Sequence, residues 1–124
     1  MLGRYTMKRG AKAADLPEGI RQDSRKHTRH PLRPVKEDVD RYLAAPSDQA
    51  WEDFREAYLA ALEERFAEDR GPYDALAELA AEDDVLLGCS CPTAKNPDVK
   101  RCHTTLALRF MQTKYPRLRV QLPG

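Results

Sequence analysis

One short apolar run constrains the fold of this 124-residue chain more than any other feature. The residues Val-Leu-Leu-Gly-Cys at positions 85–89 lie between the acidic pair Asp83-Asp84 and Pro92. A continuous apolar run of this length, bounded in this way, is typical of a strand buried on both faces, as in the centre of a parallel sheet. We therefore expect a central strand over residues 85–89, with Cys89 at its carboxyl end.

Three helical patterns precede this strand. The first is predicted after Pro34, whose fixed φ suits the first turn of a helix, and it ends before Pro46. The second has the clearest apolar stripe, with side chains at i, i+3 or i+4 spacing. Its members are Trp51, Phe54, Tyr58, Leu62 and Phe66. A third helix is expected after Gly71, so three helices lead into the buried strand.

The remaining segments are shorter or less regular. Asp98 is placed to cap a fourth helix, and the polar–apolar alternation of residues 117–122 predicts an edge strand. Aromatic and β-branched residues predict a short strand over residues 4–9. Residues 10–34 carry several glycines and prolines and no periodicity, so we expect one long basic loop there.

Together these elements predict one α/β domain spanning residues 1–124. Its sheet is expected to be mostly parallel, with about three strands and about four helices in two or three layers. The strand at 85–89, the fourth helix and the strand at 117–122 would form a right-handed parallel crossover. A chain of this length is sufficient for one hydrophobic core.

Charge is unevenly distributed along the chain. Residues 1–36 hold ten Lys/Arg and three Asp/Glu, residues 37–84 hold four and sixteen, and residues 85–124 hold seven and one. If the two basic ends meet in the fold, they form a positive face for an anionic small molecule or a nucleic acid. The acidic middle also fits the solvated faces of helices.

The sequence also indicates the cellular compartment in which the protein is expected. No apolar stretch is long enough to span a membrane, and residues 1–17 lack the apolar region of a signal peptide. Three closely spaced cysteines fit free thiols or a metal site better than a disulfide framework. We therefore expect a cytoplasmic protein. Oligomeric state is not predicted by these patterns.

The three cysteines lie together around the predicted carboxyl end of the central strand. Cys89 and Cys91 follow one another there, and Cys102-His103 opens the next helix. In parallel sheets this edge is where ligands bind. The helix N-terminus, Lys100 and Arg101 are expected to lower the pKa of Cys102 and favour its thiolate.

Three interpretations of this segment remain open. In the first, Cys102 and His103 are catalytic or bind an electrophile, and Lys100, Arg101, Cys89, Cys91 and Arg9 contribute to binding an anion. In the second, Cys89, Cys91, Cys102 and His103 ligate zinc, although adjacent helical residues point about 100° apart. In the third, the cysteines are ordinary buried core residues.

Three stretches of the chain resemble a known family. The sequences WEDFREAYLAALEERF, DVLLGCSCP and RCHTTLALRF are similar to the domain of unknown function 488 family, in its short form with a C-x-C strand end and a Cys-His helix start. The similarity covers residues 37–112. It implies an α/β fold and a site at Cys89, Cys91, Cys102 and His103, and it implies no particular reaction.

Overall fold

The sheet is built around the predicted apolar strand. In a computed structural model that describes residues 1–123, β3 (Val85–Cys89) lies between β1 (Leu2–Thr6) and β2 (Ile20–Asp23), and both pairings are parallel. Every residue of β3 is buried. The prediction of a central strand ending at Cys89 is therefore confirmed.

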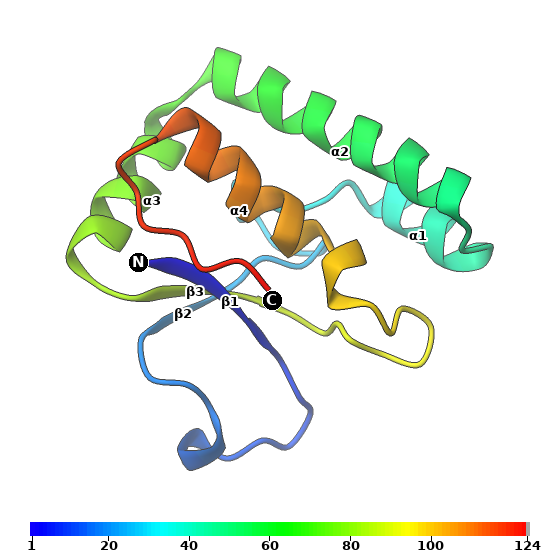
Figure 1. Ribbon diagram of the computed structural model, residues 1–124, viewed down its shortest axis with the longest axis horizontal. Helices are drawn as coiled ribbons and strands as arrows, with labels where there is room; N and C mark the ends of the chain where they lie inside the picture. The colour runs from blue at the N-terminus through cyan, green and yellow to red at the C-terminus, as the bar shows by residue number, and fades with distance from the viewer. Residues whose placement is uncertain (124) are drawn as a thin grey trace.

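Four α-helices accompany this sheet in the described part of the chain, residues 1–123. They are α1 (Lys36–Ala44), α2 (Asp48–Glu68), α3 (Gly71–Glu82) and α4 (His103–Lys114). Helix α4 packs on β1 and β3, and α2 packs against α1 and α4, so α4 lies between α2 and the sheet (Figure 1). The small α/β fold with three strands and four helices is as predicted, and its sheet is entirely parallel.

The helices bury the stripes that the sequence predicts. Trp51, Phe54, Tyr58 and Leu62 are the buried residues of α2, and Ser47 caps the helix by accepting a hydrogen bond from the backbone N–H of Ala50 at 3.0 Å. These side chains join residues of β3 and α4 in one hydrophobic core. None of the helices in residues 1–123 is both long and apolar enough to cross a bilayer.

Two strand predictions need correction. The third strand is β2, which lies within the segment expected to be one long loop, residues 10–34. Residues 117–122 do not form a strand in the described structure, and only Val120 forms an isolated parallel bridge, with Leu2. Leu2 exchanges two backbone hydrogen bonds with this segment, at 2.8 and 2.9 Å. The first strand also begins earlier than expected, at Leu2 instead of residue 4.

The segment before α4 also differs from its prediction. Asp98 caps a one-turn 3₁₀ helix, η2 (Val99–Arg101), by accepting a hydrogen bond from the backbone N–H of Lys100 at 2.9 Å. Cys102 follows in an extended conformation, with φ −126° and ψ 148°, and α4 begins at His103. Cys102 is thus the N-cap of α4 and does not belong to its first turn.

Candidate functional site

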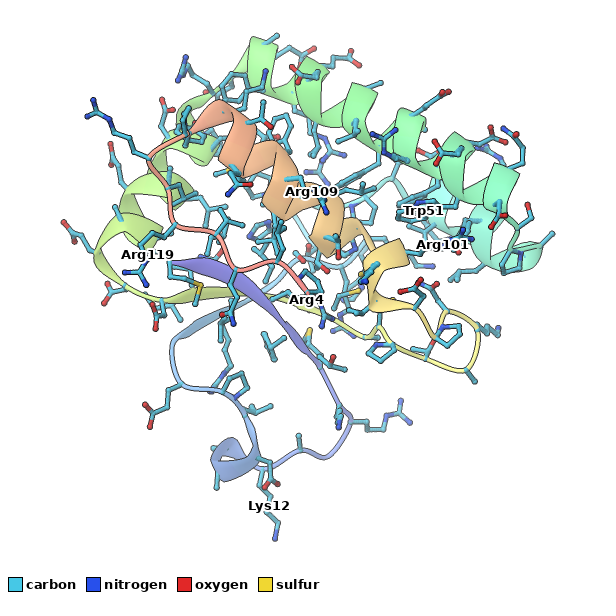
Figure 2. All side chains as sticks on the ribbon, in the orientation of Figure 1. Arg4, Lys12, Trp51, Arg101, Arg109 and Arg119 are labelled. Atoms are coloured by element: carbon cyan, nitrogen blue, oxygen red, sulfur yellow. The ribbon has the colours of Figure 1, made fainter. Side chains whose placement is uncertain are left out.

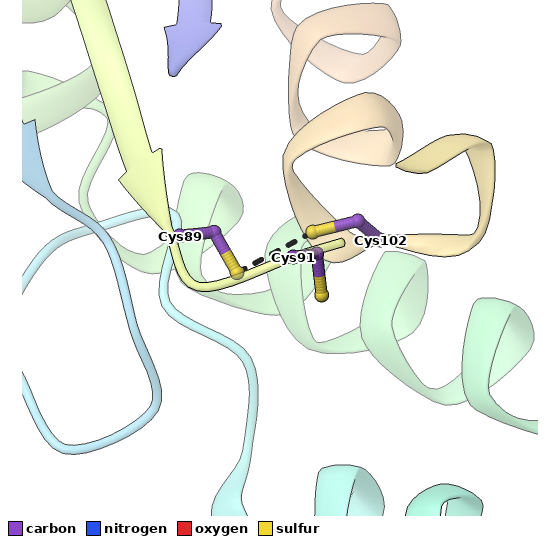
Figure 3. Close-up of side chains that lie close together, drawn as sticks. All are labelled: Cys89, Cys91 and Cys102. Carbon is purple, nitrogen blue, oxygen red and sulfur yellow. Dashed lines mark hydrogen bonds between the residues drawn. The ribbon is translucent and has the colours of Figure 1, made fainter. Parts of the chain in front are cut away.

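The three thiols meet beyond the carboxyl end of β3. The sulfur atoms of Cys89, Cys91 and Cys102 all lie within 4.8 Å of one another, and those of Cys89 and Cys102 are 3.4 Å apart (Figure 3). Cys89 and Cys102 are buried, and Cys91 is partly exposed. A small set of three cysteines that could hold one metal ion is therefore present in the structure.

The imidazole of His103 lies close to two of these sulfurs. Its Nδ1 atom lies 3.8 Å from Sγ of Cys89 and 3.9 Å from Sγ of Cys102. The sequence-based argument that Cys102 and His103 diverge by about 100° does not hold, because it assumes that both residues are helical. Cys102 is instead extended, and its sulfur lies within reach of the imidazole of the next residue.

The cluster opens onto a pocket of about 280 Å³. One wall is apolar and comes mainly from α1 and α2, with Tyr42, Trp51 and Phe54 as its aromatic residues. The rings of Trp51 and Phe54 stack with their centroids 5.5 Å apart, and Tyr42 meets Trp51 edge to face at 5.7 Å. The three cysteines and His103 also line the pocket.

Cationic side chains also line this pocket. They are Arg25 and Lys26, from the loop after β2, and Arg101, from η2. Each pairs with a carboxylate on the protein: Arg25 with Asp23 at 2.8 Å, Lys26 with Asp40 at 2.5 Å and Arg101 with Asp48 at 2.6 Å. The Asp48 side chain is 93% exposed, so its pair with Arg101 contributes little to stability.

The structure does not bring all predicted binding residues to this pocket. Of the described residues that line it, Arg101, Cys89, Cys91, Cys102 and His103 were predicted. Lys100 is exposed and lines a separate hollow beside Arg55 and Arg109, and Arg9 is exposed outside the described lining of the pocket. The basic N-terminal segment does contribute to the wall, but through residues 25–27 and not through residues 8–9.

The protonation states within the cluster differ from the sequence-based prediction. The thiol hydrogen bonds of Cys102 to Cys89 and Cys91, together with burial, raise the pKa of Cys102 well above its ordinary value. The expected low pKa of Cys102 is therefore wrong. Hydrogen bonds from Cys102 and Cys89, and then from Asn96, instead lower the pKa of Cys91. This direction favours the charged form of Cys91.

Several polar residues that sequence reasoning missed hold the cluster in place. The side-chain amide of Asn96 donates to Sγ of Cys91 at 3.3 Å and to the carbonyl of Arg101 at 2.7 Å. The hydroxyl of Thr104 donates to Sγ of Cys102 at 3.2 Å. No local pattern marks these contacts in advance, although Asn96 lies between the two cysteine segments in the sequence.

Ser24 and Arg4 support the site from the other two strands. The hydroxyl oxygen of Ser24, directly after β2, lies 3.1 Å from Nε2 of His103. Arg4 lies on β1 (Figure 2). Its guanidinium group donates to the carbonyl of Cys91 at 2.7 Å. All three strands therefore position this site, with β3 supplying a sulfur and its two neighbours supplying polar contacts.

Comparison with known proteins gives one result. Residues 7–115 match a protein-family model described as the active DUF488-N3 subclade. Neither a curated protein nor a solved structure matches the chain. The family match covers most of the chain, including all three cysteines and His103, and it agrees with the resemblance carried by the helix, strand and Cys-His stretches. The chain therefore belongs to the domain of unknown function 488 family.

Proposed function

We propose that this protein binds an anionic ligand with a planar apolar part and that Cys91 acts on the ligand as a thiolate nucleophile. The observation that carries the proposal is the position of Cys91, the partly exposed member of a three-thiol cluster in the wall of the pocket. Two buried thiols and the Asn96 amide surround its sulfur, and such hydrogen bonds favour the charged form.

The shape of the pocket supports this ligand class. The aromatic wall offers a surface on which a flat ring can stack. The guanidinium groups of Arg25 and Arg101, on the rim, can bind a carboxylate or a phosphate in a forked geometry. A nucleotide, free or within a nucleic acid, combines both features. Because the site requires reduced thiols, we place the protein in the cytoplasm.

Alkylation kinetics test the nucleophile. Iodoacetamide is added to the folded wild-type protein and to its C91S and C102S variants between pH 5 and pH 9, and the modified cysteine is identified by mass spectrometry. We expect one fast-reacting thiol, present in the wild type and in C102S and lost in C91S. A Cys91 that reacts no faster than an unstructured cysteine peptide would refute the proposal.

Ligand binding is tested separately. Adenosine and guanosine monophosphates are titrated into the protein while the fluorescence of Trp51, its single tryptophan, is followed. Arg101→Gln should weaken binding at least several-fold, and Lys100→Gln is the matched control because Lys100 lies outside the described lining of the pocket. Equal binding by the two variants would contradict the assigned anion contact.

A second candidate is a zinc-binding module, and the sulfur spacing favours it. Four ligands placed tetrahedrally around zinc, at about 2.3 Å for sulfur, lie about 3.8 Å from one another. The 3.4 Å between Cys89 and Cys102 is close to that value, and Cys91 is within 4.8 Å of both. His103 contacts Cys89 and Cys102 at similar distances and would complete the set.

Metal analysis separates the two candidates. The protein is purified without chelator, and its zinc content and reactive thiols are then counted before and after treatment with EDTA. One equivalent of zinc, with three thiols protected until the chelator is added, would establish the zinc-binding module. Metal-free protein with a reactive Cys91 supports the nucleophile.

A further inference from the structure

A buried serine–histidine contact lies behind the thiol cluster. Ser24 is fully buried, and its hydroxyl oxygen lies 3.0 Å from the carbonyl oxygen of Gly88 and 3.1 Å from Nε2 of His103. His103 is only 6% exposed. Both partners of the serine hydroxyl are therefore shielded from water, and its single proton can satisfy only one of them.

The carbonyl oxygen decides where this proton goes. An oxygen of Gly88 can only accept, so the 3.0 Å contact is favourable only when the Ser24 hydroxyl donates to it. If the hydroxyl turned to donate to His103, the lone pairs of two oxygens would face each other at this distance. With its proton on the Gly88 side, the Ser24 oxygen must accept a hydrogen bond from Nε2–H of His103.

This hydrogen bond determines the other ring nitrogen. The His103 ring is buried between the Ser24 hydroxyl and two thiols, and a neutral imidazole carries one N–H group. With that proton on Nε2, Nδ1 keeps its lone pair. The lone pair is on the side of the ring that approaches the sulfurs of Cys89 and Cys102, at 3.8 and 3.9 Å.

We propose that Ser24 is a positioning residue that selects the Nε2–H tautomer of His103 and thereby presents Nδ1 to the cluster as a proton acceptor for a thiol. The inference deepens the proposed function and rests on it for its role in catalysis. Ser24 touches neither the pocket ligand nor Cys91 in this scheme, and it acts through the imidazole.

Nδ1 of His103 provides an additional acceptor for the thiol protons of the cluster. When Cys91 is ionised, the cluster holds two thiol protons, on Cys89 and Cys102. Acceptors for these protons are the Cys91 sulfur, Nδ1 of His103 and the Cys89 sulfur, toward which Cys102 donates at 3.4 Å. Either thiol can donate to the Cys91 sulfur or to Nδ1, which lies 3.8 Å from Cys89 and 3.9 Å from Cys102, so the lone pair of His103 gives their protons a second position in the cluster. The opposite tautomer would direct a third donor into the same cluster.

Nuclear magnetic resonance reads the tautomer directly. The full-length protein is labelled with ¹⁵N-histidine, and long-range ¹H–¹⁵N correlations are recorded at pH 7 under reducing conditions, with His103 assigned by its loss in H103Q. We expect only the Nε2–H pattern for His103 in the wild type. In S24A we expect both tautomers, and in S24T, which restores the hydroxyl, the single pattern should return.

His30 provides an internal control in the same spectra. Its Nδ1 accepts from the backbone N–H of Leu32 at 3.1 Å, and its Nε2 lies 2.7 Å from Oε1 of Gln22. These contacts favour Nε2–H and do not involve Ser24, so the His30 pattern should be identical in S24A. That result also shows that the variant is folded.

Two outcomes would overturn the inference. One is a wild-type His103 protonated on Nδ1, a result that needs no variant. The other is a folded S24A protein with an unchanged His103 pattern. Neither readout depends on the reactivity of Cys91. An Nε2–H tautomer together with an unreactive Cys91 would therefore refute the proposed function alone, leaving the tautomer assignment in place.

Discussion

The guanidinium group of Arg4 donates a hydrogen bond to the backbone carbonyl of Cys91 at 2.7 Å, joining residues 87 positions apart. Its Nε also donates to the hydroxyl of Thr104 at 3.0 Å, and that hydroxyl donates in turn to Sγ of Cys102. One side chain on β1 thus connects the loop after β3 with the start of α4. The two halves of the cysteine site are held together by a residue outside both.

Arg4→Lys tests this connection. A lysine ammonium cannot reproduce the planar fork that reaches both partners. The Thr6 hydroxyl still donates to the Cys91 carbonyl at 2.8 Å, so we expect the free energy of unfolding to fall by about 0.5–1.5 kcal/mol, the usual net contribution of one hydrogen bond. Iodoacetamide should also reach Cys89 and Cys102 faster. Urea unfolding and alkylation kinetics measure both effects, and Arg9→Lys, at an exposed position, serves as the control. A change no larger than that of the control would contradict the role of Arg4.

Stability should fall between about pH 6.5 and pH 4. Burial lowers the pKa of His30 and of His103 to about 4, against an ordinary value of 6.5. Since the unfolded chain binds these protons more tightly, their contribution is complete above pH 6.5 and is lost as pH falls through the folded-state pKa. The lowered pKa of Cys91 acts in the same direction.

The loss should amount to a few kcal/mol, since one pKa unit corresponds to about 1.4 kcal/mol. Urea midpoints at pH 7, 6, 5 and 4 measure it. His103→Gln should flatten this dependence in proportion to its share, whereas the exposed His27→Gln should leave it unchanged. A midpoint that stays constant from pH 7 to pH 4 would contradict the buried, neutral state of both rings.

Tyr58→Phe should destabilise the fold without disturbing its packing. The hydroxyl of Tyr58 donates to the carbonyl of Leu32 at 2.6 Å, and the side chain is 1% exposed. Removing the hydroxyl leaves that carbonyl without this partner in the interior, at a cost of about 1–3 kcal/mol. Thermal and urea unfolding measure the loss. Tyr5→Phe is the comparison, because the Tyr5 side chain is partly exposed, and an equal effect in both variants would argue against the assigned bond.

Trp51→Ala should affect both stability and the pocket. Trp51 is 9% exposed and contacts the rings of Tyr42 and Phe54. Truncating a large aromatic side chain in a core costs about 3–5 kcal/mol, and the stacking wall would be lost with it. Trp51→Phe should retain much of the stability and much of the stacking wall. Calorimetry of unfolding and of nucleotide binding measures the two effects. Unchanged stability of the Ala variant would contradict the assignment of Trp51 to the core.

Local sequence patterns were sufficient to predict the elements whose buried side chains recur regularly along the chain. The run at residues 85–89 could be predicted as the central strand because both faces of that strand are apolar. The stripe of α2 could be predicted because its buried residues recur every three or four positions. Strand β2 could not be found in this way. Its residues, Ile20–Asp23, are polar apart from Ile20, and they pair with β3 through backbone hydrogen bonds, which leave no mark in the pattern of side chains.

The sequence by itself determined the α/β class and the meeting of Cys89, Cys91, Cys102 and His103, since a strand end and the following helix start must lie close together. Only the tertiary structure decided how exposed each sulfur is and which hydrogen-bond donors surround it. A thiol's ionisation depends on its burial and on the donors around it, and here these come from distant residues. They bury Cys102, leave Cys91 partly exposed and place Ser24 and Arg4, from the two outer strands of the sheet, behind the site.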